Sequence, residues 1–232
     1  CARLHGEGAG GWGGGAARGG GGRIGFFRTI KVNGEATQGG PLSGQASPRP
    51  GDAYARSKWE AEQALFEVAG RTALEAVVLR PPLVYGAGAK GHFLTLLKVC
   101  RAAPPLPLAA IANSRSLIYA GNLADAAILC LEHPGAAGKV YLVSDGDDIS
   151  SPELIRRVAA ALGRPARLFS VPGPLLRLAG AWSGNGARIS RLLDSATLDD
   201  GKIREELDWT PPFTMVQGLN QTARWFSAPP TE

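Results

Sequence analysis

The segment Asp52-Ala-Tyr-Ala-Arg-Ser-Lys-Trp-Glu-Ala-Glu62 carries two side chains whose spacing decides how the chain is interpreted. Tyr54 and Lys58 are four residues apart, so on a helix they lie on the same face. An ammonium beside a phenol favours the phenolate, and Lys58 is therefore expected to lower the pKa of Tyr54. A tyrosine tuned in this way can exchange protons near neutral pH. By itself, the pair also fits a solvated helix face that happens to carry a lysine.

Around this segment, apolar runs alternate with helical patterns. The run from 74 to 83 is continuous and rich in valine, which is typical of a strand buried on both faces. The remaining strands are predicted at 23–29, 116–119, 140–143 and 168–171, and the helices at 52–69, 92–101, 123–133, 151–162, 174–182, 200–207 and 216–226. Strands that alternate with helices predict a parallel α/β sheet.

Four separated motifs occur in an informative order. They are Gly25-Phe-Phe-Arg-Thr29, the Tyr-x-x-x-Lys segment, Ala76-Val-Val-Leu-Arg-Pro-Pro-Leu-Val-Tyr-Gly86 and Leu207-Asp-Trp-Thr-Pro-Pro-Phe213. Together they resemble the extended short-chain dehydrogenase/reductase family. Within it, the chain is most similar to the NAD-dependent epimerase/dehydratases that act on nucleotide sugars, of the UDP-glucose 4-epimerase type. The resemblance runs from about residue 24 to about residue 226.

The resemblance implies a Rossmann-like doubly wound parallel sheet that lacks its N-terminal half, followed by a small C-terminal substrate domain. We expect a Gly-rich tail over 1–22, the C-terminal part of a dinucleotide-binding domain over 23–145 with substrate insertions near 89–115, and a mainly substrate-binding domain over 146–232. The Gly-rich phosphate loop of the family is missing, so the chain is expected to be N-terminally truncated. Our hypothesis for the tail is a frame-shifted reading of the alanine-rich helix that the family places before the Thr29 strand, and we expect the tail to be disordered. The family also implies a homodimer that pairs through the Tyr-x-x-x-Lys helix.

The same resemblance assigns roles to five residues. Thr29 hydrogen-bonds the reacting oxygen, Tyr54 transfers the proton, and Lys58 tunes the tyrosine and holds the ribose of NAD. Pro81 flanks the nicotinamide, and Leu83 faces the sugar. The alternatives are structural: Thr29 fills the end of a strand, and Pro81 stiffens a turn.

Two arginines are candidates for the nucleotide of the substrate. Arg115, in Ser114-Arg-Ser-Leu-Ile-Tyr, aligns with a nucleotide-binding arginine of UDP-sugar epimerases, and Arg191 is a weaker second candidate. A guanidinium suits a diphosphate because it presents paired donors. The histidines and cysteines have no metal-ligand spacing, so no metal site is expected.

Composition excludes several classes of protein. The net charge of +5 comes almost entirely from residues 1–31, where five basic residues face one acidic residue. The rest of the chain is nearly neutral and carries no basic stripe for nucleic acid. It has no apolar run long enough for a membrane and no apolar stretch of a signal peptide near its start, and three scattered cysteines fit a reducing cytoplasm. Gly6, Gly8 and Gly11 match Gly-x-Gly-x-x-Gly, but no strand precedes them and no helix follows, so the match is attributed to glycine density.

The sequence thus predicts an NAD-dependent epimerase or dehydratase that acts at C4 of a nucleotide sugar, with a UDP-sugar preferred. Two alternatives stay open. The first is that the chain is not an enzyme by itself but an inactive fragment or a nucleotide-sugar binding module. The second is that it is an NADPH-dependent ketone or sterol-type reductase of the same superfamily.

Overall fold

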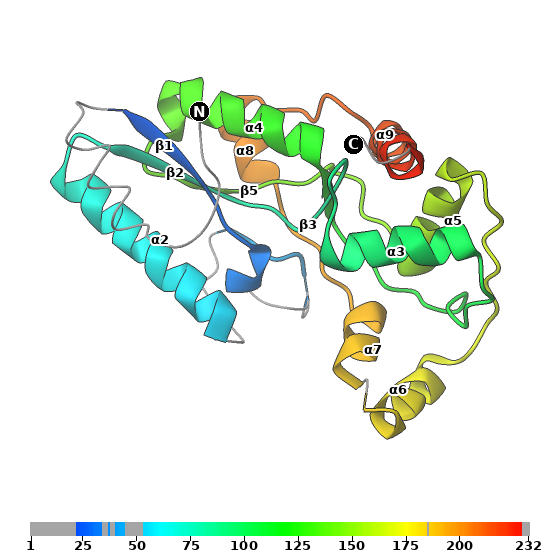
Figure 1. Ribbon diagram of the computed structural model, residues 1–232. Coiled ribbons are helices and arrows are strands. Elements are labelled where there is room, and N and C mark those ends of the chain that lie inside the picture. The colour runs from blue at the N-terminus through cyan, green and yellow to red at the C-terminus, as the bar shows by residue number, and fades with distance from the viewer. Residues whose placement is uncertain (1–21, 34–36, 38–39, 45–52, 185, 229–232) are drawn as a thin grey trace.

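A computed structural model describes residues 22–33, 37, 40–44, 53–184 and 186–228 (Figure 1). The Gly6-Gly8-Gly11 pattern and the expected helix cap Asp52 lie outside these residues. The strands are β1 (Arg23–Phe27), β2 (Glu75–Arg80), β3 (Leu83–Tyr85), β4 (Leu117–Tyr119) and β5 (Val140–Leu142). The helices are α2 (Ala53–Arg71), α3 (Gly91–Ala102), α4 (Ala120–Glu132), α5 (Ser151–Ala161), α6 (Gly173–Trp182), α7 (Gly186–Leu193), α8 (Gly201–Leu207) and α9 (Met215–Ser227), with 3-10 turns η1 (Ile30–Val32) and η2 (Pro134–Ala136).

Within the described residues, the strands form two parallel sheets. β1, β2 and β5 make a three-stranded sheet with β2 in the centre, and β3 pairs with β4. Phe26 lies opposite Val78, which in turn lies opposite Val140. The parallel α/β architecture predicted from the alternation of strands and helices is therefore confirmed.

The central strand β2 is buried on both faces. Ala76 and Val78 pack in a core with Leu65 of α2, while Val77 and Leu79 pack in a second core that α4 and α8 complete. In Figure 1, α2 covers one face of the sheet, and α4 and α8 lie on the other. A strand covered on both sides needs apolar residues at successive positions, and residues 76–79 of β2 supply them.

The expectation of one strand from 74 to 83 is wrong. β2 ends at Arg80, Pro81 and Pro82 follow, and β3 starts at Leu83 in the other sheet. Proline has no backbone N–H for a ladder hydrogen bond, so two in succession end the pairing with the first sheet. The chain crosses between the sheets at this point.

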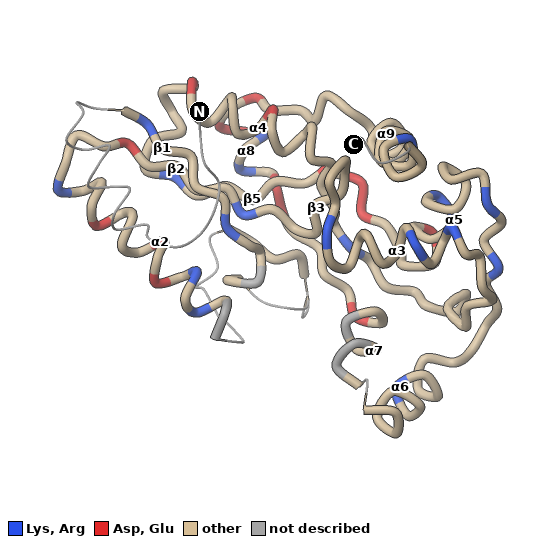
Figure 2. The backbone as a smooth tube through the Cα atoms, viewed as in Figure 1, with Lys and Arg blue, Asp and Glu red and all other residues tan. Residues whose placement is uncertain are grey.

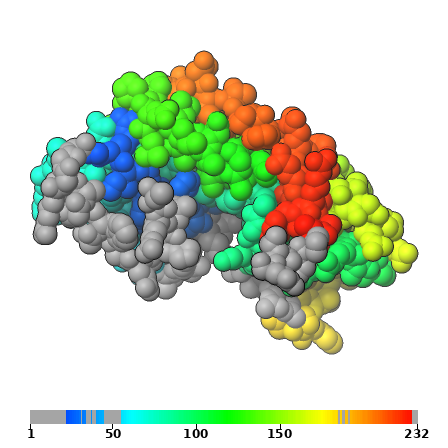
Figure 3. Space-filling view, turned by 45° about the horizontal axis from the view of Figure 1, so that its top comes forward, coloured from blue at the N-terminus to red at the C-terminus, as the bar shows by residue number. Residues whose placement is uncertain are grey.

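The second half of the molecule surrounds β3 and β4. Its core contains Tyr85, Phe93, Leu117 and Leu219 from β3, α3, β4 and α9. Helix α9 approaches closely because position 218 is glycine: an added Cβ would lie 2.8 Å from the Tyr119 ring. Figure 3 shows the segment from α8 to α9, orange to red, running beside α4 in green. This segment holds the Trp-Thr-Pro-Pro motif, which packs it against α4.

That packing role is visible in the contacts of Trp209. Its side chain is 3% exposed, and its indole Nε1 donates to Asp125 Oδ2 of α4 at 2.9 Å. This hydrogen bond fastens the segment before α9 to α4.

Three further expectations need correction. Residues 168–171 form no strand, and only Leu168 bridges to Leu106. Helix α7 was not expected. The N-cap of α5 is Ser150, whose hydroxyl accepts from the Glu153 amide, one residue before the expected Ser151.

The surface of the described part is of mixed charge. Along α2, basic residues lie near both ends and acidic residues between them, and α5 is surrounded mainly by Lys and Arg (Figure 2). No described helix has the length and apolarity to cross a bilayer.

Candidate active site

The carboxyl ends of β1 and β2 place two of the predicted residues side by side. The Arg28 amide donates to the Leu79 carbonyl at 2.8 Å, and the Ile30 amide donates to the Pro81 carbonyl at 3.2 Å. The ladder therefore continues past both strands, with Thr29 between these two hydrogen bonds. Thr29 is partly buried and Pro81 is buried. Ligands in open α/β sheets bind beyond this edge.

Helix α2 begins at the same edge. Tyr54 and Lys58 both lie in its first two turns, and Figure 1 shows α2 running back along the sheet from the end where β1 leads into η1. The predicted spacing on one helix face is therefore present in the backbone. Lys58 is partly buried, and the side chain of Tyr54 lies outside the described side chains.

A buried polar cluster at this edge was not predicted. The guanidinium of Arg80 donates from Nε and Nη2 to the carboxylate of Glu62, at 3.2 and 2.5 Å, and from Nη1 to Asn33 Oδ1 at 2.8 Å. The Arg80 and Glu62 side chains are 3% and 1% exposed. An arginine that ends an otherwise apolar, buried strand was the available signal, because such a charge needs a partner.

Leu83 and Arg115 come together at the second sheet. Leu83 pairs with Leu117 in the parallel register of β3 and β4, and Arg115 lies two residues before Leu117. Two residues of extended chain span about 7 Å. The backbone of Arg115 is fixed on both sides, by bridges to Ile149 and to Ala196. Its side chain is partly buried, and burial lowers the pKa of the guanidinium while nearby Asp194 opposes that shift.

The segment that follows α7 is tied to the Arg115 strand. The side-chain amide of Asn113 donates to Ser151 Oγ at 2.9 Å and to the carbonyls of Leu192 and Asp194 at 3.0 and 3.2 Å. Arg191 belongs to α7, so its backbone comes close to the Arg115 segment. Its side chain lies outside the described side chains.

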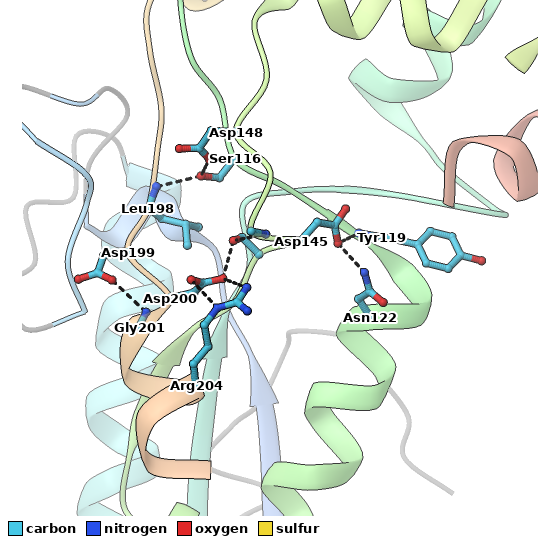
Figure 4. A network of polar contacts seen from close by, with 12 residues as sticks. Ser116, Tyr119, Asn122, Asp145, Asp148, Leu198, Asp199, Asp200, Gly201 and Arg204 are labelled. Carbon is cyan, nitrogen blue, oxygen red and sulfur yellow. Dashed lines mark hydrogen bonds and ion pairs between the residues drawn. The ribbon is translucent and has the colours of Figure 1, made fainter. Parts of the chain in front are cut away.

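A separate polar network lies beyond the carboxyl end of β5 and links it to the second sheet (Figure 4). Asp145 accepts from the Tyr85 hydroxyl at 2.6 Å, from Asn122 Nδ2 at 2.7 Å and from the Tyr119 amide at 2.9 Å. Burial raises the pKa of Asp145, although these three hydrogen bonds lower it. Burial and the adjacent carboxylate also raise the pKa of Tyr85, so this phenol stays protonated.

An open pocket of about 310 Å³ borders this network, lined by Asp145, Gly146, Asp200, Arg204, Thr210, Pro211, Phe213 and Thr214. None of the residues predicted for chemistry lies in it. Its carboxylates have partners within the protein, since Asp200 accepts from Arg204 at 2.9 Å and from Ser144 at 2.7 Å. We therefore interpret the network as structural; the residues predicted for chemistry include Thr29 and Pro81, which meet at the ends of β1 and β2. Among the described residues, no group of three His, Cys, Asp or Glu could hold a metal ion.

Known proteins share this fold. The family model for the NAD dependent epimerase/dehydratase family matches residues 16–144. A UDP-glucose 4-epimerase from Vibrio cholerae is 39% identical over 203 residues, which cover 87% of this chain and 62% of that protein. Among solved structures, UDP-glucose 4-epimerase from Thermotoga maritima with UDP-glucose superposes with a TM-score of 0.69 at 20% identity, over 91% of this chain and 65% of that one.

The corresponding enzyme of Thermus thermophilus, in complex with NAD, gives a TM-score of 0.70 at 21% identity, over 92% of this chain and 67% of that one. The chain thus spans about three fifths of the length of its curated relative. Because the family model covers more than half of the chain and the fold agrees, this protein belongs to the NAD-dependent epimerase/dehydratase family.

Proposed function

We propose that this chain is the catalytic and substrate-binding part of an NAD-dependent enzyme that acts at C4 of a nucleotide sugar, with a UDP-sugar as the preferred substrate. The observation that carries the proposal is the meeting of three segments at one strand edge. Thr29 follows β1, Pro81 follows β2 and hydrogen-bonds the Thr29 segment, and α2 begins there with Tyr54 and Lys58.

The residues at this edge suit the nicotinamide half of NAD. A partly buried lysine on the first turns of α2 offers an ammonium to the ribose hydroxyls, and the buried Pro81 offers an apolar wall to the ring. NAD, when bound, supplies hydride acceptance and return at the sugar carbon. The pyrophosphate site is left unassigned, because the Gly-rich loop of the family has no counterpart among the described residues.

The protein's own part is proton transfer at the sugar 4-hydroxyl. Tyr54, as the phenolate, takes the hydroxyl proton while the C4–H bond breaks, and returns it when that bond is re-formed. Lys58 keeps the phenolate accessible near neutral pH because its positive charge favours the anion. The Thr29 hydroxyl hydrogen-bonds the reacting oxygen and fixes its direction. Leu83 bounds the sugar, and Arg115, with Arg191 as a second candidate, holds the diphosphate.

The test is Tyr54→Phe in the protein expressed from its complete gene. The ring keeps its shape and loses the transferable proton, so turnover of the nucleotide sugar should fall at least 100-fold, in line with the ~10²–10⁴-fold worth of a positioned acid or base. NAD affinity, measured by calorimetry, should stay within about twofold. Turnover close to that of the wild type would remove Tyr54 from proton transfer. The homodimer, the cytoplasmic location and the division at residues 22 and 145 stay predictions.

A further inference from the structure

Arg80 contacts the three segments that carry the proposed chemistry. It directly precedes Pro81 on β2. Its Nη1 reaches Asn33, at the end of the turn that starts from Thr29, and its Nε and Nη2 reach Glu62, one helical turn after Lys58 on α2. Lys58 and Glu62 are four residues apart, so they share a helix face with each other and with Tyr54.

The geometry points to a positioning clamp. We propose that Arg80, Glu62 and Asn33 set the position of the Thr29 hydroxyl relative to the Tyr54–Lys58 turn, and that Asn33 is the contact on which the Thr29 segment depends. The inference rests on the proposed function, since it assigns a purpose to that alignment. None of the three residues needs to touch substrate, so each acts as a positioning residue.

Asn33 is rigidly connected to Thr29. The Val32 amide donates to the Thr29 carbonyl at 3.2 Å, and the Asn33 amide donates to the Ile30 carbonyl at 2.8 Å, which makes η1 a single tight turn between them. The Asn33 side chain is satisfied at both ends: Oδ1 accepts from Arg80, and Nδ2 donates to the Ser43 carbonyl at 3.1 Å. These partners fix which end of the amide faces Arg80.

The clamp is suited to holding one arrangement because it is buried and charged. The Arg80 and Glu62 side chains are almost inaccessible, and Asn33 is 6% exposed. Solvent cannot substitute for a lost partner there, so a shift of η1 or α2 would leave a charge or an amide unsatisfied. The Thr29 turn and the first turns of α2 are thus coupled, because displacing either one would break its hydrogen bond to Arg80.

The deciding variant is Asn33→Leu, which keeps the side-chain volume and removes both the acceptor for Arg80 and the donor to Ser43, while leaving the Arg80–Glu62 pair in place. Hydrogen exchange of the 1–232 chain without cofactor is read by mass spectrometry. Exchange of the Arg28–Val32 amides should rise at least tenfold, and that of the α2 amides around Glu62 should stay within twofold. In the protein from its complete gene, kcat should fall at least tenfold with KM for the nucleotide sugar within twofold. Asn33→Asp, which retains the acceptor, should recover most of kcat.

Asn122→Leu is the matched control. Asn122 is fully buried, and its side chain bonds Asp145 and Phe213, neither of which is a partner of Arg80, Glu62 or Asn33. It should lower thermal stability without changing exchange at Arg28–Val32 or the kcat of the folded protein. If Asn33→Leu does not fold, Asn33→Ala is used in its place, because it removes the same acceptor.

Two outcomes would overturn the clamp. One is unchanged Arg28–Val32 exchange in Asn33→Leu. The other is a kcat loss that Asn122→Leu reproduces at equal stability, because the effect would then be general destabilisation. Failure of the proposed function would give another result. Tyr54→Phe would then keep the turnover of the wild type, whatever the effect of Asn33→Leu on amide hydrogen exchange.

Discussion

Arg115 is a charged side chain held partly inside the protein, and its surroundings bear on what it can bind. Both flanks of its backbone are fixed, by hydrogen bonds of Arg115 with Ile149 and of Ser116 with Ala196. A guanidinium whose backbone cannot shift is suited to a ligand of fixed geometry, such as a diphosphate. Burial also strengthens its attraction to an anion, because less water screens the charge.

Arg115→Ala should weaken binding of the nucleotide sugar by roughly 1.5–3 kcal/mol, the usual worth of one charge-assisted hydrogen bond. The proposed nicotinamide site lies at the carboxyl ends of β1 and β2 and not beside Arg115, so NAD affinity should not change. Calorimetry with UDP-glucose and with NAD measures both. Arg164→Ala, at an exposed arginine just after α5, is the matched control and should alter neither. Equal loss of both ligands would indicate misfolding, and no loss would remove Arg115 from the site.

At the level of elements, α8 is fastened to β5 by a surface cluster. Glu206 of α8 accepts from Lys139 Nζ at 2.8 Å and from the Tyr141 hydroxyl at 2.9 Å. The hydrogen bond from Lys139, followed by that from Tyr141, lowers the pKa of Glu206. A carboxyl whose folded-state pKa is depressed stabilises the fold above its ordinary value of 4.5, and that contribution disappears as the pH falls through the lower folded value.

Glu206→Gln should therefore lower the free energy of unfolding at pH 7 and converge with the wild type at acid pH. The expected loss is small, about 0.2–1 kcal/mol, because the side chains of this pair are about a third exposed and solvent screens them. Urea unfolding at pH 7 and at pH 3 measures it, with Glu205→Gln, at the exposed neighbouring position, as the control. A difference that is equal at both pH values would contradict the assignment.

The elements that sequence reasoning predicted best are those whose burial is uniform. The valines of β2 lie between two helical layers, so hydropathy identified the strand correctly. Its end was missed because Pro82 and Leu83 continue the apolar run, and hydropathy does not register a missing N–H donor. Helix α7 was missed because it has only eight residues and starts at Gly186, a residue type that disfavours helix. The partners of Arg80 lie 18 and 47 residues away in sequence, so no local pattern could pair them.

At the level of the whole molecule, the chain passes from the three-stranded sheet to the two-stranded sheet at Pro81 and Pro82. The three-stranded sheet with α2, α4 and α8 carries the Thr29, Tyr54 and Lys58 segments, and the second sheet with α3, α5 and α9 carries Arg115. Passing from β2 to β3 moves the chain from the proposed hydride-transfer edge to the proposed nucleotide-binding edge within three residues.

The central claim is chemistry at C4 of a nucleotide sugar, and isotopic labelling at that carbon tests it directly. The protein from its complete gene is incubated with NAD and UDP-glucose carrying deuterium at C4, and the sugar is followed by NMR. We predict inversion, oxidation or elimination that starts at C4, proceeds more slowly than with unlabelled substrate, and is lost in Tyr54→Phe. A sugar left unchanged at C4 by folded, NAD-bound protein, with turnover of hydrophobic ketones in its place, would contradict the account.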